Sequence, residues 1–191
     1  MKQCVINDIE NNLIDKLITR YNIKSDEIKK LGGYQNFIFQ FTKNNKQYIL
    51  RVTDSEHRTE EELQEEITFL KLLNKSHVSI GKEVTFPSNN RIEKFQTREN
   101  TFFTCVFKKV SGIEWREFTS DSDTFYQAGK MLGKIHNVSK NIPNRLKRNY
   151  WNTNQYIENV NKVISDKDIL NKFSLFMSNL NKLPKSQESF G

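Results

Sequence analysis

Apolar residues near the amino terminus recur at intervals of three and four positions. They are Ile6, Ile9, Leu13, Leu17 and Tyr21. This spacing places the side chains on one face of an α-helix, with polar residues on the others. The pattern therefore predicts an amphipathic helix over about residues 7–21.

From Glu27 onward the hydrophobic period changes from helical spacing to two. In "FIFQF" (37–41) the phenylalanines alternate with Ile38 and Gln40, and "QYILRV" (47–52) follows after "KNNK" (43–46). Alternation predicts half-buried strands, and Asn-rich dipeptides are typical of tight turns. We expect an antiparallel meander over about residues 25–53, with Gly32-Gly33 in the loop before its second strand.

The segment "TEEELQEEITFLKLLNK" (59–75) carries the clearest helix signal in the chain. Thr59 and Glu62 have the spacing of a capping box, and acidic residues fill the first turns, where the helix dipole favours them. An apolar stripe then runs through Leu63, Ile67, Leu70 and Leu73. Two further strand-like runs follow, near 91–96 and 101–109, and "VSGIEW" (110–115) is predicted to be a connector.

Beyond the connector, the pattern is helical throughout. Helices are predicted over residues 122–139, 153–164 and 167–181. The order of elements predicts an α+β fold, in which an antiparallel five-stranded sheet lobe with a helix is followed by a helical lobe. We place the boundary near Val110, which gives domains 1–109 and 110–191.

Composition indicates a folded protein. The 191 residues are 36% hydrophobic and 12% aromatic, and no run approaches the length of about 18 apolar residues that a membrane helix needs. The first residues lack the apolar stretch of a signal peptide. The two cysteines, Cys4 and Cys105, form no spaced pair, which argues against structural zinc. We therefore expect a cytoplasmic protein without a membrane partner.

The formal net charge of +7 permits several partners. It fits a nucleic acid, an anionic small molecule such as a nucleotide, or an ordinary solvated surface. The densest basic stretch, "NRLKRNY" (144–150), lacks the interleaved aromatics of a single-strand-binding face, and acidic runs such as "TEEELQEE" interrupt the positive charge. The sequence therefore argues against nucleic acid, although it leaves a basic nucleic-acid-binding module as an alternative.

Three features occur in an order that suggests chemistry. A Gly32-Gly33 loop joins two strands, Arg51 lies in the third strand, and Glu66 lies in the following helix. Taken singly, they are an ordinary turn, a surface cation and a solvated carboxylate. Taken together, they fit a design in which a glycine-rich hairpin approaches phosphates, a strand cation contacts them, and a helix carboxylate holds that cation.

On these residues the chain resembles the aminoglycoside phosphotransferase and choline kinase group of kinase-like enzymes. "LGGYQNFIFQF" (31–41) resembles the nucleotide loop of that group, and "YILRV" (48–52) its third strand, with Arg51 at the position of a Lys or Arg. "EEITFLKLL" (65–73) resembles the next helix and places its carboxylate at Glu66. "CVFKKVSGIEW" (105–115) is similar to the hinge, and "AGKMLGKIHNVS" (128–139) to the first long helix of the second lobe.

The resemblance implies a transferase that phosphorylates a hydroxyl of a small molecule with ATP or GTP. It implies that Phe107 lines the back of an adenine pocket and that the backbones of Lys108 and Val110 bond the adenine edge. The acceptor is not specified. The implied nucleotide-binding residues are Gly32, Gly33, Tyr34, Asn36, Arg51, Glu66, Phe107, Lys108 and Val110.

One part of the family pattern is missing from this sequence. The group has a His-Gly-Asp loop, an Asn several residues later and a further Asp, which position the acceptor and hold magnesium. No His-Gly-Asp occurs here, and the chain resembles only the first half to two-thirds of such an enzyme, with a truncated helical lobe. We assign no catalytic or metal-binding residues, expect magnesium only in a full-length enzyme, and expect the 191 residues to be inactive alone.

Several alternatives stay open at this point. The chain is either a piece of a longer enzyme or a natural truncation, and a catalytically dead, kinase-like interaction protein is an alternative function. His136 is expected to be a core residue of the helix over 122–139, with a role in supporting a catalytic loop as the alternative. "DSD" (121–123) is interpreted as a helix cap in preference to a metal site.

Overall fold

The computed structural model describes residues 3–33, 35–85, 88–112, 122–140, 142 and 153–182. The chain forms two compact units, Met1–Val138 and Ser139–Gly191. The boundary predicted near Val110 stays a prediction, because residues 113–121 lie outside the described part of the chain.

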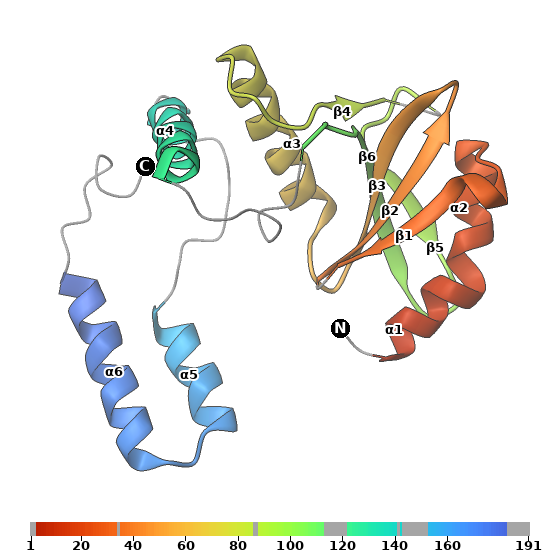
Figure 1. Ribbon diagram of the computed structural model, residues 1–191. Helices are drawn as coiled ribbons and strands as arrows, with labels where there is room; N and C mark the ends of the chain where they lie inside the picture. Colours follow the sequence, from red (N-terminus) through yellow and green to blue (C-terminus); the bar gives the residue numbers. More distant parts are fainter. Residues whose placement is uncertain are drawn as a thin grey trace. The chain divides into compact units, whose positions relative to one another are not determined.

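The first unit is built on a six-stranded antiparallel sheet (Figure 1). Five strands follow one another across it in the order β1 (Ile28–Gly32), β2 (Asn36–Lys43), β3 (Lys46–Asp54), β6 (Thr101–Lys108) and β4 (Glu83–Val84), and β5 (Glu93–Gln96) also pairs with β6. The predicted meander and its turn are confirmed, since Asn44 and Asn45 have positive φ angles of 51° and 59°. The prediction of five strands missed β4, whose two residues are too few to show a period.

The N-terminal helix covers one face of the sheet (Figure 1). It runs through α1 (Gln3–Asp8), a π-helical turn (Ile9–Leu13) and α2 (Ile14–Tyr21), and it begins four residues before the predicted start. Its apolar stripe packs with the phenylalanines of β2 and with residues of β3 and β6 in one buried cluster. Each large side chain buried there contributes about 1.5–3 kcal/mol. The buried members are Val5, Ile9, Leu13, Leu17, Tyr21, Ile23, Phe37, Phe39, Phe41, Leu50, Val52, Phe102 and Val106.

Polar contacts tie the same helix to the β5–β6 hairpin. A buried carboxylate, an exposed lysine, an arginine and a tyrosine each reach a partner on that hairpin, so the helix is held along its length. The pairs are Asp8 with Thr97 and Asn100, Lys16 with the carbonyl of Gln96, Arg20 with Glu93, and Tyr21 with Thr104.

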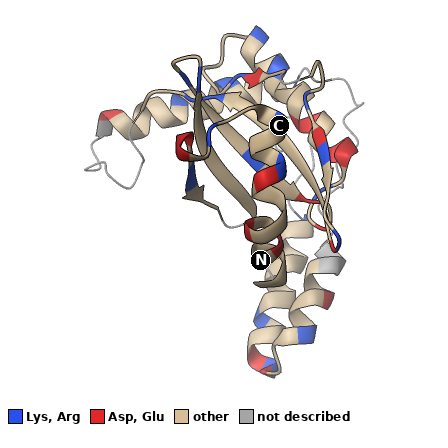
Figure 2. Ribbon diagram, turned by 90° about the vertical axis from the view of Figure 1, so that its right-hand side faces the viewer, with Lys and Arg blue, Asp and Glu red and all other residues tan. Residues whose placement is uncertain are grey.

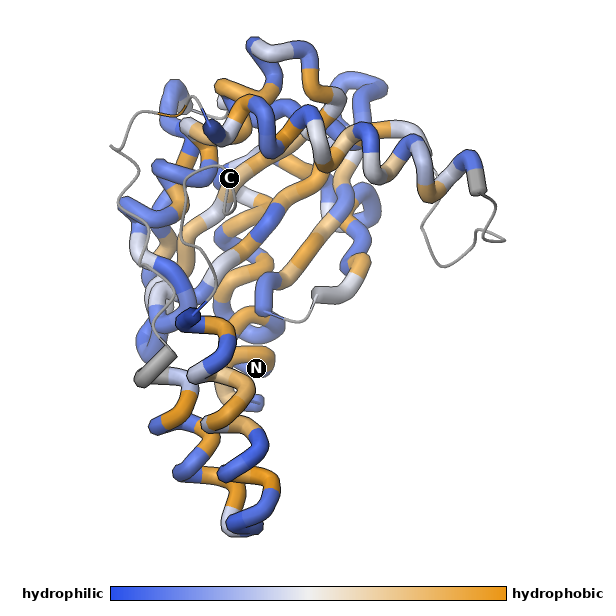
Figure 3. The backbone as a smooth tube through the Cα atoms, turned by 90° about the vertical axis from the view of Figure 1, so that its left-hand side faces the viewer, coloured by the Kyte–Doolittle hydropathy of each residue, from blue (hydrophilic) through white to orange (hydrophobic). Residues whose placement is uncertain are grey.

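Helix α3 (Glu60–Lys75) packs against the other face of the sheet. The predicted capping box is confirmed: the Thr59 hydroxyl accepts from the Glu62 N–H at 3.2 Å, and the Glu62 carboxylate accepts from the Thr59 N–H at 3.0 Å. Leu63 and Ile67 are buried against β6 residues. Figure 3 shows hydrophobic positions along the strands that these two helical layers enclose.

The remaining helices agree with the predicted spans to within one residue. Helix α4 covers Ser122–Ser139, and the second unit contains α5 (Thr153–Val163) and α6 (Lys167–Lys182). The carboxylate of Asp166 caps α6 by accepting from the N–H groups of Asp168 and Ile169 at 2.9 and 3.2 Å. None of the described helices is long and apolar enough to cross a bilayer.

Large apolar side chains are exposed on these later helices. They are Phe125, Tyr126, Met131 and Leu132 on α4, and Tyr156, Val163, Ile169, Leu175 and Phe176 on α5 and α6. His136 is exposed, so the prediction that it is a core residue is wrong; no described side chain of α4 is fully buried. The cap predicted at residues 121–123 includes Asp121, which lies outside the described residues.

Candidate functional site

The register of the central strands brings several predicted residues to one face of the sheet. Asn36 is opposite Thr53, and Ile38 is opposite Arg51, across the β2–β3 pair. Opposed residues of antiparallel strands place their side chains on the same side, and positions two apart share that side. We use the name open face for five half-buried residues on this side, which are Asn36, Ile38, Ile49, Arg51 and Phe107.

The structure joins the predicted cation and carboxylate. Nη1 of Arg51 in β3 donates to Oε1 of Glu66 in α3 at 2.6 Å. The two side chains are 16% and 25% exposed, so the pair is partly shielded from water. A charge-assisted bond at this distance is among the stronger side-chain contacts. It fixes the position of the Arg51 guanidinium within the open face.

The rest of the Arg51 guanidinium is poorly satisfied. Nε and Nη2 are buried and have no hydrogen-bond partner among the described residues. Burial opposes the charge, but the bond and charge of Glu66, with smaller contributions from the Cys105 side chain, outweigh it, so the pKa of Arg51 is raised above its ordinary value. A buried donor without a partner costs about 1–3 kcal/mol. These two nitrogens therefore favour a ligand that brings acceptor oxygens.

Two neighbours complete the surroundings of this guanidinium. The ring of Phe107 lies 5.4 Å from Cζ of Arg51, within the range of a cation–π contact. Cys105 is opposite Arg51 across the β3–β6 pair, and burial raises the pKa of its thiol, although the charge of Arg51 lowers it. The thiol is therefore neutral at pH 7, and Arg51 keeps the net positive charge of this contact.

The glycine loop has a backbone that only glycine accommodates. Gly32 and Gly33 have φ angles of +118° and +132°, a region that L side chains rarely adopt. A Cβ on Gly33 would lie 1.7 Å from the carbonyl oxygen of Asn36, whereas one on Gly32 would meet nothing within 4 Å. Tyr34, the third predicted loop residue, lies outside the described residues.

The predicted hinge residues lie at the end of β6. Phe107 is on the open face, and Val110, beyond the strand, is 63% exposed. The backbone N–H of Lys108 donates to the carbonyl of Lys82 at 2.9 Å. That N–H is therefore occupied, and the backbone contact predicted for Lys108 is restricted to its carbonyl.

Sequence reasoning left three residues near the site unassigned. Ile38 and Ile49 are, with Phe107, the apolar members of the open face, and Thr53 donates from Oγ1 to Oδ1 of Asn36 at 2.7 Å. The alternation in the predicted strands carried this signal, because it places Ile49 and Thr53 on the same side as Arg51.

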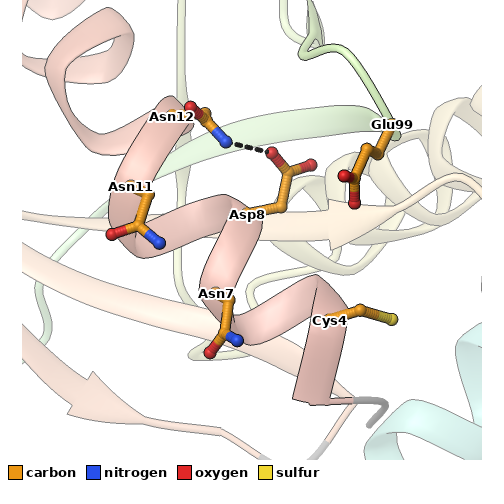
Figure 4. Close-up of a pocket in the computed structure, with 6 residues that line it drawn as sticks. All are labelled: Cys4, Asn7, Asp8, Asn11, Asn12 and Glu99. Atoms are coloured by element: carbon orange, nitrogen blue, oxygen red, sulfur yellow. Dashed lines mark hydrogen bonds between the residues drawn. The ribbon is translucent and has the colours of Figure 1, made fainter.

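A polar pocket lies elsewhere in the first unit, at the junction of α1 with the loop before β6 (Figure 4). Its lining residues are Cys4, Asn7, Asp8, Asn11, Asn12 and Glu99. Burial raises the pKa of Asp8, but hydrogen bonds from Asn100, Thr97 and Asn12 outweigh it, so the pKa is lowered. The Asp8 carboxylate is thus satisfied within the protein, unlike the Arg51 guanidinium.

Within the described ranges, no three or more His, Cys, Asp or Glu side chains gather in a way that could hold a metal ion. Basic and acidic residues are interspersed on the ribbon in Figure 2. The open face is therefore distinguished by buried, unpartnered donors rather than by a cluster of ligands or a surface of one charge.

Residues 27–185 match the phosphotransferase enzyme family APH. An amicoumacin kinase of Bacillus subtilis (strain 168) is 24% identical over 187 residues, which cover 95% of this chain and 56% of that protein. The chain thus spans little more than half the length of this relative.

Solved structures share the fold. An amicoumacin kinase in complex with AMP-PNP, Ca²⁺ and Ami has a TM-score of 0.83 at 19% identity, over 98% of this chain and 58% of the other. A microcompartment-associated aminopropanol kinase has a TM-score of 0.61 at 21% identity, and the match covers 72% of this chain and 43% of the other. The helices and sheet described above are therefore those of a kinase-like fold, and, since the family match covers most of its residues, the chain belongs to the APH phosphotransferase enzyme family.

Proposed function

We propose that this chain binds the donor nucleotide of a small-molecule kinase, which transfers a phosphoryl group from ATP to a hydroxyl of its acceptor. The observation that carries this proposal is Arg51, which is held by Glu66 and has two buried nitrogens with no hydrogen-bond partner among the residues that the structure describes. Phosphate oxygens fit such donors, because arginine presents them in a planar fork. The family match supports the same reaction class.

The glycine loop, the open face and the end of β6 each have a place in this proposal. Backbone N–H groups of the Gly32-Gly33 loop approach the phosphates, and Nε and Nη2 of Arg51 donate to phosphate oxygens. The adenine packs on the apolar side chains of Ile38 and Ile49. Its edge bonds the Lys108 carbonyl and the backbone of Val110. ATP is favoured over GTP because the similar amicoumacin kinase structure contains AMP-PNP.

Phosphoryl transfer needs magnesium and a catalytic loop, and we assign neither role to any of these residues. Magnesium, when bound, neutralises charge on the transferred phosphoryl group, and the sequence Met1–Gly191 contains no His-Gly-Asp. We therefore propose that the 191 residues bind nucleotide without transferring phosphate by themselves. Amicoumacin is the first acceptor to test with any longer form, because kinases of that name match nearly the whole chain.

A cytoplasmic location is part of the same proposal. ATP is the donor that the open face is proposed to hold, and both cysteines are free thiols, as is usual in a reducing compartment. Fractionation of the source cells would test it directly; recovery outside the cytoplasmic fraction would contradict it.

Binding and transfer should be measured separately. Calorimetric titration of the purified chain with Mg·ATP is expected to give saturable binding, and ATP at 100 times its Kd should stabilise the fold by about 2.7 kcal/mol. Mass spectrometry should then find no phosphorylated amicoumacin. Failure to bind ATP would overturn the nucleotide proposal and favour a dead interaction protein, whereas turnover would overturn only the proposed inactivity.

A further inference from the structure

A buried hydroxyl controls the orientation of one side chain on the open face. Thr53 is only 1% exposed, and its Oγ1 donates to Oδ1 of Asn36 at 2.7 Å. The two residues are directly opposite in the β2–β3 pair, so strand register maintains the contact. A hydrogen bond between cross-strand neighbours in this position is short, local and sheltered from competing water.

The contact fixes the donor end of the Asn36 amide as well. An asparagine side chain carries an acceptor oxygen and a donor nitrogen on the same planar group. Once Thr53 takes the oxygen, the nitrogen must point away from Thr53. Nδ2 of Asn36 has no hydrogen-bond partner among the described residues, and the side chain is half-buried rather than free in solvent.

Asn36 also contacts the glycine loop through its backbone. Its carbonyl oxygen lies where a Cβ of Gly33 would be, 1.7 Å from the ideal position. Along the strand, Asn36 is two residues nearer that loop than Ile38, the residue opposite Arg51. An amide donor is thus held on the same face as the Arg51 donors, at the end of the strand where the loop begins.

We propose that Thr53 is a positioning residue for nucleotide binding: it orients Asn36 so that Nδ2 donates to a phosphate oxygen. This inference rests on the proposed function, since it requires nucleotide phosphate on the open face. Thr53 itself touches no ligand in this proposal. Its hydroxyl acts only through the amide of Asn36, which makes the effect of its removal specific to phosphate.

Two substitutions in the 191-residue chain separate the hydroxyl from side-chain shape. Thr53→Val keeps the branched shape and removes the donor, whereas Thr53→Ser keeps the donor. We expect Thr53→Val to weaken Mg·ATP binding about five- to tenfold, the value of one hydrogen bond, and Thr53→Ser to stay within about twofold of wild type. Asn36→Asp replaces the N–H donor by an anionic oxygen and should weaken ATP by more than about tenfold.

Adenosine is the probe that distinguishes positioning from general support of the fold. It lacks phosphates, so its affinity should stay the same in wild type and in all three variants. The side-chain N–H₂ signals of Asn36, assigned by their loss in Asn36→Asp, should shift saturably as wild type binds ATP. If Thr53→Val does not fold, the response of these signals still tests whether Nδ2 of Asn36 meets the bound nucleotide.

Unchanged ATP affinity in Thr53→Val and Asn36→Asp, or equal losses for ATP and adenosine, would overturn the inference while leaving nucleotide binding intact. Amide signals of Asn36 that do not respond to bound ATP would overturn it too. Absence of ATP binding by the wild-type chain would instead overturn the proposed function, and this inference with it.

Discussion

Two arginine–glutamate pairs in the first unit differ in how completely they are satisfied. In the pair of Arg20 and Glu93, Nε and Nη2 both donate to one carboxylate oxygen, at 3.1 and 2.7 Å, and Ser88 donates to the other. The Arg20 side chain is 47% exposed. In the pair of Arg51 and Glu66, Nη1 is bonded, whereas Nε and Nη2 are buried and have no hydrogen-bond partner within the described part of the chain.

The difference separates a structural contact from a candidate binding group. Glu93 receives all its bonds from the protein, and the exposed part of Arg20 is hydrated, so this pair fastens α2 to β5 without needing a ligand. The spare Arg51 donors are buried and have no hydrogen-bond partner among the described residues, and leaving such donors unpaired costs free energy that a bound anion would recover. Residue type alone does not distinguish the pairs; burial of the unused donors does.

The largest expected effect comes from truncating each arginine in turn. Arg51→Ala should weaken ATP binding about 100-fold, because two charge-assisted bonds to phosphate are lost. Arg20→Ala is the matched control: it should lower the free energy of unfolding by about 1–3 kcal/mol, since Glu93 is left buried without its cation. Its ATP affinity should be unchanged. Calorimetry and urea unfolding of both variants measure this; equal losses of affinity would refute the distinction.

The two glycines of the loop offer a second matched pair. Gly33→Ala should weaken ATP binding about tenfold or more, because its Cβ would overlap the Asn36 carbonyl and shift the loop. Gly32→Ala has a strained φ but open space, so its loss should be smaller. Titration of both variants with ATP provides the comparison. Equal affinities in the two variants would show that loop position does not matter to binding.

Replacing Arg51 by lysine tests the fork rather than the charge. A lysine ammonium cannot hold Glu66 and present two coplanar donors at once, so Arg51→Lys should weaken ATP binding about tenfold while leaving adenosine affinity unchanged. Competition between ATP and adenosine in the same titration measures both. Wild-type ATP affinity in this variant would mean that a single positive charge is sufficient.

The smallest expected effect concerns pH and the buried carboxylate on the opposite side of the sheet. The pKa of Asp8 in the folded chain is lowered from its ordinary value, so its ionised form stabilises the fold at neutral pH, and the contribution is lost as pH falls through the folded pKa. Asp8→Asn should lower the free energy of unfolding by about 1 kcal/mol at pH 7 and by less near pH 3. It should leave the affinity for ATP unchanged. Urea unfolding at both pH values checks this; a cost independent of pH would contradict it.

Much of the sheet was predictable because local signals agreed with the final fold. The turn of Asn44 and Asn45 even determines the pairing of Asn36 with Thr53, because a two-residue hairpin fixes every register position beyond it. Thr53 was still missed, since a threonine in a strand is ordinary until its partner is known. The π-helical turn was missed because Ile9 and Leu13 keep a normal four-residue spacing.

Contacts between distant segments were harder to predict. Arg51 and Glu66 are 15 residues apart and were paired from the order of strand and helix, whereas Arg20 and Glu93 are 73 apart and share no local pattern. Likewise, no sequence signal showed that two Arg51 nitrogens would be buried. That property depends on how α3 and β6 pack around the side chain.

The most direct test of the central claim is to observe both guanidinium groups while nucleotide is added. In a ¹⁵N–¹H spectrum of the chain, the Nε–H signal of Arg51 is predicted to shift saturably with Mg·ATP, at the Kd measured by calorimetry. The Nε–H signal of Arg20, already bonded to Glu93, is predicted not to move. A silent Arg51 signal under saturating ATP, or parallel shifts of both arginines, would contradict the account.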